Sequence, residues 1–208
     1  KNLAKVGGKT LIARAIEESI AASVFDEIIV SSDDKEVFKI ASLYDVTVVE
    51  RPKELAGSTI SSDRVISNVI DVCQIEPSTV IAYLQPTSPL RTGGHIREAL
   101  RIFMDSVGDA VISVKPVAAS WYKILQLNDD GHVVGAVSPD APFMNRQSVP
   151  PIFLPNGAIY MFRVDQFSEN SQKIPRVVMS PYVMSESDSM DIDCVEDLRK
   201  AEQSLAEQ

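Results

Sequence analysis

The sequence feature that most constrains the fold is an alternation of helical stripes with short apolar runs. Apolar side chains recur at helical spacing over residues 11–23, and a short β-branched run follows at 27–31. The alternation continues with a helix over 33–44, a strand over 47–50 and a helical stripe over 65–73. Parallel strands need such helical crossovers, so the pattern predicts an α/β fold with a mostly parallel sheet flanked by helices.

The pattern continues to residue 117 and returns near residue 156. The remaining elements that it predicts are strands at 80–84, 110–117 and 158–162 and helices after Gly94 and at 195–205. Between them, over 118–155, the periodicity weakens and prolines accumulate, which favours an extended arm or small subdomain. We therefore predict an α/β domain formed by 1–117 and 156–208, with 118–155 as the arm.

Composition narrows the classes of partner. The formal net charge is -9 and no basic run is present, which argues against nucleic acid as a partner. No window approaches the roughly 20 apolar residues of a membrane span, and the first residues lack the apolar core of a signal peptide, so no membrane association is expected. Cys73 and Cys194 form no ligand cluster, so we expect a cytoplasmic protein without structural zinc.

A pair of acids just before the last predicted helix is the first candidate for chemistry. Alternate residues of an extended segment point the same way, so Asp191 and Asp193 are placed to share Mg²⁺. Helix-capping or solvated acids are the alternative interpretation, because Asp is common near helix starts.

Polar residues follow the carboxyl ends of two predicted strands, where ligands of open α/β sheets gather. Arg51 is placed to contact a nucleotide or phosphate, and the hydroxyl of Ser62 at a helix N-terminus suits an anion. Gln85, followed by the segment 87–91, is placed to read a base or sugar. A surface turn with a capping serine would explain these residues as well.

Basic and amide side chains also flank the proline-rich stretch. Lys123 follows the tryptophan, Arg146 and Gln147 precede the last prolines, and Asn156 follows them. Basic groups here could bind a sugar carboxylate, for which Arg offers a bidentate grip. A solvated arm is the alternative.

Taken in order, several segments resemble the CMP-sialic acid synthetase (acylneuraminate cytidylyltransferase) family. The resemblance covers essentially the whole chain, and its most specific parts are LQPTSPLRT at 84–92 and PNGAIY at 155–160. The other matching segments are KNL at 1–3, FDEIIVSSD at 25–33, RPKELA at 51–56 and SMDID at 189–193.

The resemblance implies a fold and a reaction. The fold would be a Rossmann-like nucleotide-diphospho-sugar transferase with a mixed seven-stranded sheet and a projecting dimerisation arm that completes the partner's sugar site. The reaction would be Mg²⁺-dependent attack by the anomeric 2-hydroxyl of a nine-carbon keto sugar acid, of the N-acetylneuraminate or legionaminate type, on the α-phosphate of CTP. Pyrophosphate would leave.

The family's functional residues map onto this chain position by position. Lys1 and Asn2 match the end of the nucleotide-binding loop, where Lys1 would be a catalytic residue. Asp191 and Asp193 match the catalytic metal ligands. The remaining matches are to nucleotide contacts at Arg51 and Ser62, a sugar contact at Gln85, and the sugar-carboxylate region at Lys123, Arg146, Gln147 and Asn156.

The chain also departs from the family pattern. The family's first strand and its ARxxSKG loop would precede Lys1, so we predict that the 208 residues alone cannot catalyse transfer. Ser58 stands where the family often has Asp, and Leu154 stands where some members have Arg.

Two alternatives stay open. One is a 3-deoxy-manno-octulosonate cytidylyltransferase, although that family tends to carry a QGDEP-like element where this chain has QPTSP. The other is a non-catalytic nucleotide-binding homologue.

Overall fold

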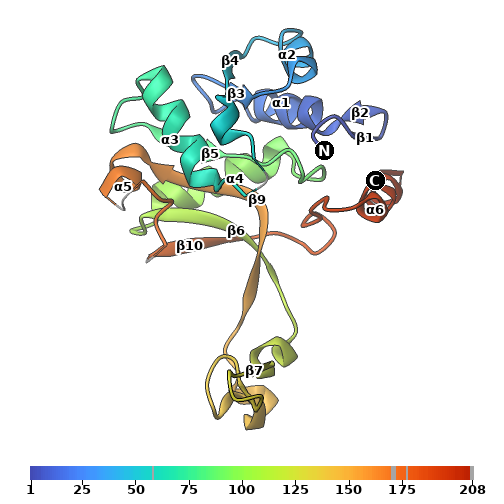
Figure 1. Ribbon diagram of the computed structural model, residues 1–208, viewed down its shortest axis with the longest axis vertical. Coiled ribbons are helices and arrows are strands. Elements are labelled where there is room, and N and C mark those ends of the chain that lie inside the picture. Colours follow the sequence, from blue (N-terminus) through green and yellow to red (C-terminus); the bar gives the residue numbers. More distant parts are fainter. Residues whose placement is uncertain (58, 170–171, 177, 207–208) are drawn as a thin grey trace.

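The computed structural model describes residues 1–208 except 58, 170–171, 177 and 207–208. Its central element is a four-stranded sheet in the order β10-β6-β9-β5 (Figure 1). The strands are β5 (Val80–Tyr83), β6 (Ala110–Pro116), β9 (Phe153–Arg163) and β10 (Met179–Val183). β10 runs parallel to β6, whereas β9 runs antiparallel to both of its neighbours, so the sheet is mixed.

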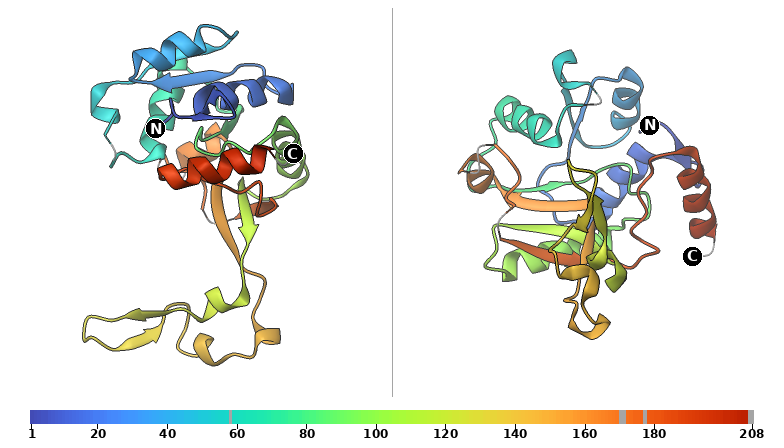
Figure 2. Two further views of the ribbon diagram at one scale, coloured as in Figure 1. Left: turned by 90° about the vertical axis from the view of Figure 1, so that its right-hand side faces the viewer. Right: turned by 60° about the horizontal axis from the view of Figure 1, so that its bottom comes forward.

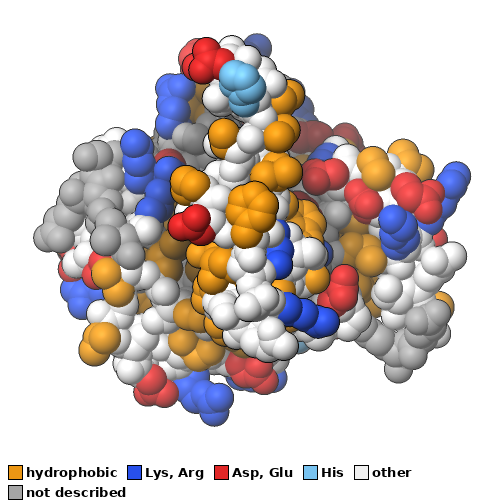
Figure 3. All heavy atoms as spheres, turned by 90° about the horizontal axis from the view of Figure 1, so that it is seen from below, with side chains coloured by type: hydrophobic (Ala, Val, Ile, Leu, Met, Phe, Trp, Pro, Cys, Tyr) orange, Lys and Arg blue, Asp and Glu red, His pale blue; other side chains and the backbone are white. Residues whose placement is uncertain are grey.

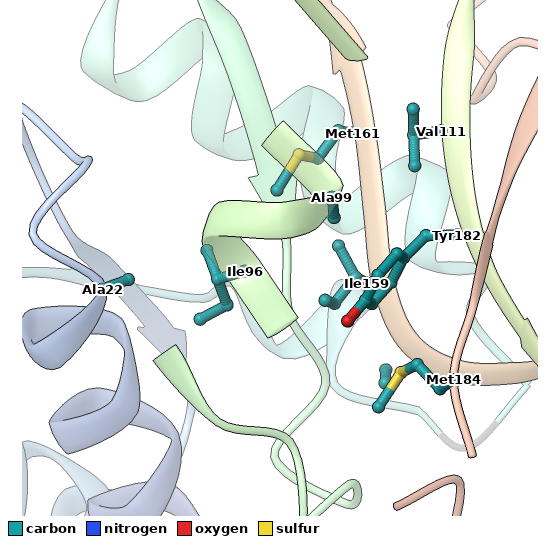
Figure 4. Packing of buried hydrophobic residues seen from close by; sticks show 9 residues of the cluster. Ala22, Ile96, Ala99, Val111, Ile159, Met161, Tyr182 and Met184 are labelled. Atoms are coloured by element: carbon teal, nitrogen blue, oxygen red, sulfur yellow. The ribbon is translucent and has the colours of Figure 1, made fainter. Parts of the chain in front are cut away.

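Helices cover both faces of this sheet. Successive residues of β9 point to opposite faces, which gives each face its own apolar cluster. On one face Ile96 and Ala99 of α4 pack with Ile159 and Met161 of β9 (Figure 4). On the other face Phe162 packs with side chains of α3 and α5. These helices are α3 (Ser62–Cys73), α4 (Gly93–Asp105) and α5 (Val164–Glu169), and the α/β prediction is confirmed.

A second, smaller sheet lies beside the first. It pairs β3 (Ile29–Ser32) and β4 (Thr47–Glu50) in parallel, and it packs on α1 (Leu11–Ala22) and α2 (Lys35–Ala41). The side chain of Asp34 caps α2 by accepting a hydrogen bond from the Glu36 backbone N–H.

The single seven-stranded sheet that the resemblance implies is not formed by the described residues. Instead, β3 and β5 each keep one edge that no described strand pairs, and both edges border the same cleft. The main-chain hydrogen bonds that would join the two sheets are therefore absent from the described part of the chain.

The two chain ends pack together. A short hairpin of β1 (Lys5–Val6) and β2 (Lys9–Thr10) precedes α1, and the last helix is α6 (Val195–Ala206). Val6, Leu11, Ile192 and Ala201 form one buried cluster between them. This contact brings the acidic segment before α6 next to the first residues of the chain.

Between β6 and β9 the chain projects away from the sheets as an arm (Figure 2). It holds the hairpin of β7 (Leu125–Leu127) and β8 (Val133–Gly135) and the short 3-10 helices η2 (Ala119–Lys123), η3 (Ala141–Phe143) and η4 (Arg146–Ser148). Hydrophobic side chains gather on its surface (Figure 3), among them Leu127, Val133 and Phe143. Its role in dimerisation, and the division at 118–155, stay predictions.

Among the described residues, no helix is long and apolar enough to cross a membrane.

Candidate active site

A cleft of about 1100 Å³ separates the small sheet from β5. Its walls are the facing edges of β3 and β5 and apolar side chains of α1 and α3. Several of its polar residues follow the carboxyl ends of β3, β4 and β5 in the chain. Seven of the residues predicted from sequence line this cleft: Lys1, Asn2, Arg51, Ser62, Gln85, Asp191 and Asp193.

The acidic pair lies where the alternation argument placed it. Ile192 is buried in the cluster between the chain ends, so Asp191 and Asp193 on either side of it both border the cleft. The backbone N–H of Ile192 donates to the Thr87 carbonyl at 2.8 Å, which ties the pair to the loop after β5. Asp197 accepts hydrogen bonds from the backbone N–H groups of Cys194 and Asp193, which lower the pKa of its carboxyl.

The two carboxylates are not equivalent. Asp193 is exposed and pairs with the Lys1 ammonium at 2.9 Å. Asp191 has a buried oxygen, Oδ1, without a hydrogen-bond partner among the described residues. An orphaned carboxylate oxygen beside a second carboxylate suits Mg²⁺, which protein sites bind through one or two carboxylates and leave open to phosphate oxygens. The described residues contain no cluster of three or more acidic, His or Cys ligands, so such an ion would depend on substrate and water for its other ligands.

Arg51 is held at the end of the small sheet. Its backbone N–H donates to the Ser32 carbonyl and its guanidinium donates to the Ser31 carbonyl, each at 2.7 Å. Its buried Nε has no hydrogen-bond partner in the described chain. The guanidinium thus lines the cleft in a fixed position, with donor capacity left over for an anion.

Gln85 and Tyr83 line the opposite wall, and they lie against Gly157 and Tyr160 of β9, respectively. Gly157 has φ +75°, and a side-chain carbon at this position would lie 3.1 Å from Gln85 Oε1. The glycine therefore lets the Gln85 side chain rest directly on β9. Tyr83 donates to Ser62 Oγ at 3.1 Å, and its ring lies 6.0 Å from that of Tyr160. Burial, and then Tyr83 and Asp191, raise the pKa of Tyr160.

Asn156 lies beneath the cleft wall and does not line the cleft. It is buried, its Oδ1 accepts from Ser113 Oγ and the Ala158 N–H, and its Nδ2 donates to Ser189 Oγ at 2.9 Å. Its amide thus connects β6, β9 and the segment before Asp191. In this structure these bonds occupy the Asn156 side chain and keep it out of the cleft, and a contact of Asn156 with the sugar stays a prediction.

The arm residues Lys123, Arg146 and Gln147 are likewise not brought into this chain's cleft. Lys123 lies in η2 and donates to the Met144 carbonyl, and the other two lie in η4. The arm carries all three away from the sheets (Figure 1). Their role in sugar binding stays a prediction, and it needs a second chain.

Two members of the loop after β5 are placed differently from the sequence interpretation. Ser88 and Arg91 are buried, so they support the loop instead of reading a base or sugar.

Sequence reasoning also gave no role to Gly157 or to the two tyrosines. PNGAIY does contain Gly157 and Tyr160, but a motif alone does not show that Gly157 lies against Gln85 and Tyr160 against Tyr83. Ser58 lies outside the described residues.

Comparison with known proteins agrees with this geometry. A family model described as Cytidylyltransferase matches residues 1–152. A CMP-N,N'-diacetyllegionaminic acid synthase from Legionella pneumophila is 33% identical over 202 residues, covering 93% of this chain and 84% of that protein. An N-acylneuraminate cytidylyltransferase from Streptococcus agalactiae is 28% identical over 199 residues, covering 95% of this chain. The chain spans 47% of the length of that Streptococcus relative.

Solved structures show the same fold. A CMP:2-keto-3-deoxy-manno-octonic acid synthetase complexed with CTP matches with a TM-score of 0.72 at 15% identity, covering 100% of this chain and 92% of that one. A 4-diphosphocytidyl-2C-methyl-D-erythritol synthase from Anaerococcus prevotii matches with a TM-score of 0.65 at 17% identity, covering 99% and 93%. At these identities the likeness concerns the fold alone. The family match, the relatives and the ordered motifs together show that the chain belongs to the cytidylyltransferase family, in its CMP-sialic acid synthetase branch.

Proposed function

We propose that the protein transfers CMP from CTP to the anomeric hydroxyl of a sialic-acid-like nonulosonate and releases pyrophosphate. The observation that carries the proposal is the meeting of an acidic pair with Lys1 and Arg51 in one cleft, on the side where the strands end. An acidic pair alone would repel a triphosphate. Together with two cations it suits a nucleotide that arrives with a divalent metal.

In this reaction the sugar's 2-hydroxyl oxygen forms a bond to the α-phosphorus while the bond from that phosphorus to the bridging oxygen breaks. The hydroxyl proton passes to solvent, and the bond electrons leave with pyrophosphate. Catalysis of this kind consists of positioning and charge neutralisation. Arg51 and Lys1 would neutralise phosphate charge, with Asn2 and Ser62 beside the nucleotide and Gln85 facing the sugar.

Asp191 and Asp193 would hold Mg²⁺. When bound, the ion would supply charge neutralisation at the phosphates. Lys1 donates one hydrogen bond to Asp193 Oδ1. An ammonium has three donors, so Lys1 can keep this bond and still face a phosphate.

The nine-carbon sugar class is supported by the names of the sequence relatives. These include the N-acylneuraminate and diacetyllegionaminic acid enzymes and a pseudaminic acid cytidylyltransferase from Campylobacter jejuni, which is 27% identical over 136 residues. The eight-carbon alternative rests on a likeness of fold alone. Dependence on CTP would place the reaction in the cytoplasm.

A homodimer would bring the arm residues to a sugar site. Lys123, Arg146 and Gln147 stand outside the cleft of their own chain, on an arm with exposed apolar side chains. We propose that the arm packs on a second copy and directs these residues toward the partner's cleft. Mixing an Arg146→Ala chain with an Asp191→Asn chain, each carrying an ARxxSKG-type strand and loop before Lys1, tests this. A mixed dimer would hold one intact site, whereas each variant alone would hold none.

The test of function is pyrophosphate release from CTP and Mg²⁺ with a panel of eight- and nine-carbon keto sugar acids. It is run on the 208-residue chain and on a chain with an ARxxSKG-type strand and loop before Lys1. We expect release by the extended chain with one nonulosonate and none by the shorter chain. CTP binding without release by either chain would favour the non-catalytic alternative, and a clear preference for the eight-carbon acid would replace the substrate class.

A further inference from the structure

Arg91 is a buried cation that the proposed chemistry does not use. Its side chain is 2% exposed, and within the described part of the chain no carboxylate forms an ion pair with it. Burial lowers the pKa of its guanidinium to about 10, so it stays protonated at neutral pH. A buried charge without an ion pair is costly, and it persists only where hydrogen bonds compensate it.

Within the described residues, the two hydrogen bonds of the guanidinium go to main-chain carbonyls around the cleft wall. One nitrogen, Nη1, donates to the Gln85 carbonyl at 2.8 Å and to the Ala158 carbonyl at 2.9 Å. The first carbonyl belongs to the loop after β5 and the second belongs to β9. Arg91 therefore ties the loop after β5 to the middle of β9 from inside the protein.

These two carbonyls flank one contact at the cleft wall, between Gln85, which lines the cleft, and β9. Gln85 presents its side-chain amide over Gly157, the residue just before Ala158. The main chains on both sides of that contact thus share a single donor. Any change in the length or charge of residue 91 would move the Gln85 amide relative to β9, without touching the cleft itself.

We propose that Arg91 is a positioning residue that holds the Gln85 amide for the sugar. This inference rests on the proposed function, since it assigns the sugar side of the cleft to Gln85. The acidic pair has an anchor outside this loop, because Ile192 is buried against Val6, Leu11 and Ala201, so Arg91 acts on sugar binding more than on CTP binding. Lysine would replace it only in part, because a single ammonium on a flexible stem keeps the charge but does not reproduce a rigid planar donor.

The chain offers a matched control in Arg14. The Nε of Arg14 donates to the Pro89 carbonyl at 3.2 Å. Arg14 therefore also holds the loop after β5, but through Pro89 and not through Gln85 or β9. An effect that comes only from loosening this loop should appear in Arg14→Met as well. An effect that comes from the Gln85 contact should appear only at Arg91.

The experiment measures Kd and KM for sugar and CTP in Arg91→Met, Arg91→Lys and Arg14→Met, each made in the N-terminally extended protein. The sugar is the acid that gives the fastest release in the panel, or N-acetylneuraminate where none does. For Arg91→Met we expect the sugar Kd to rise about 10-fold or more while the CTP Kd changes less than about 3-fold, from loss of charged hydrogen bonds. Arg91→Lys should lie between it and wild type, and Arg14→Met should match wild type.

A second readout covers variants that fold poorly. Guanidinium at a sub-denaturing concentration should restore sugar affinity to Arg91→Ala, whereas ammonium should not. Equal losses for sugar and CTP, an equal effect in Arg14→Met, or no loss in a folded Arg91→Met would each overturn the proposal. A wild type that binds the sugar acid without releasing pyrophosphate overturns the proposed reaction alone, because the Arg91 variants are still judged by sugar Kd. A wild type that binds no sugar acid overturns both.

Discussion

Replacing Asn156 by alanine should reduce stability strongly, because its amide joins three segments of the chain. Its strong hydrogen bonds join Oδ1 to Ser113 Oγ at 2.6 Å, Oδ1 to the Ala158 N–H at 3.2 Å, and Nδ2 to Ser189 Oγ at 2.9 Å. Three such bonds at about 1 kcal/mol each give a loss of about 3 kcal/mol in the free energy of unfolding. In a domain of this size, that corresponds to a decrease of roughly 6–12 °C in Tm.

The assay is urea denaturation followed by far-UV circular dichroism, with thermal melts in parallel. Ser113→Ala is the matched variant, since it removes the bond to Asn156 Oδ1 and the bond that Ser113 Oγ accepts from the Ile159 N–H. We expect it to cost about 2 kcal/mol. The two losses should not add in the double variant, because both changes remove the same Ser113–Asn156 bond. An Asn156→Ala protein of wild-type stability with a raised sugar KM would refute the burial argument and return Asn156 to the sugar site.

Three further outcomes are expected. Made in the N-terminally extended chain, Asp191→Asn should lower Mg²⁺-dependent turnover by about 100-fold or more with an unchanged circular dichroism spectrum. Asp130→Asn on the arm is the control and should leave turnover unchanged, so equal turnover in both variants would remove the metal assignment. Arg146→Ala should raise the sugar KM more than the CTP KM in steady-state kinetics, and a selective CTP effect would assign Arg146 to the nucleotide. The hydrogen bond from Lys9 is the largest of the interactions that lower the pKa of the Glu17 carboxyl below 4.5, whereas burial raises it. The stabilisation by the ionised carboxylate is therefore present above pH 4.5 and is lost as the pH falls through the lower folded pKa. In urea denaturation, Glu17→Gln should be less stable than wild type at pH 7 and nearly equal to it at pH 3.

Local patterns predicted the elements whose reasons are local. The stripe over 11–23 and the run over 47–50 became α1 and β4, because helical periodicity and β-branched content act within a few residues. β10 was not predicted, since Met179–Val183 contains Pro181 and gains its strand character from pairing with distant β6. The start of β9 was predicted too late for the same reason: Phe153 and Leu154 pair with β6 across the root of the arm.

The candidate site likewise contains features that local patterns predict and features that depend on distant residues. Asp191 and Asp193 were predicted from their spacing, because alternation along an extended segment is a local property. The hydrogen bonds of Asn156 and Arg91 were not predicted, since a sequence does not show which polar side chains are buried. Their partners Ser113 and Ala158 lie 43 and 67 residues away, which no local pattern encodes.

The facing edges of β3 and β5 have a consequence for how the described chain behaves in solution. Each edge presents main-chain N–H and C=O groups that no described strand pairs, and apolar side chains of α1 and α3 stand between them. Such edges attract any extended peptide, including one from a neighbouring molecule. Concentrated samples of these 208 residues should therefore self-associate through strand addition, and an exogenous β-forming peptide should suppress that association by occupying the cleft.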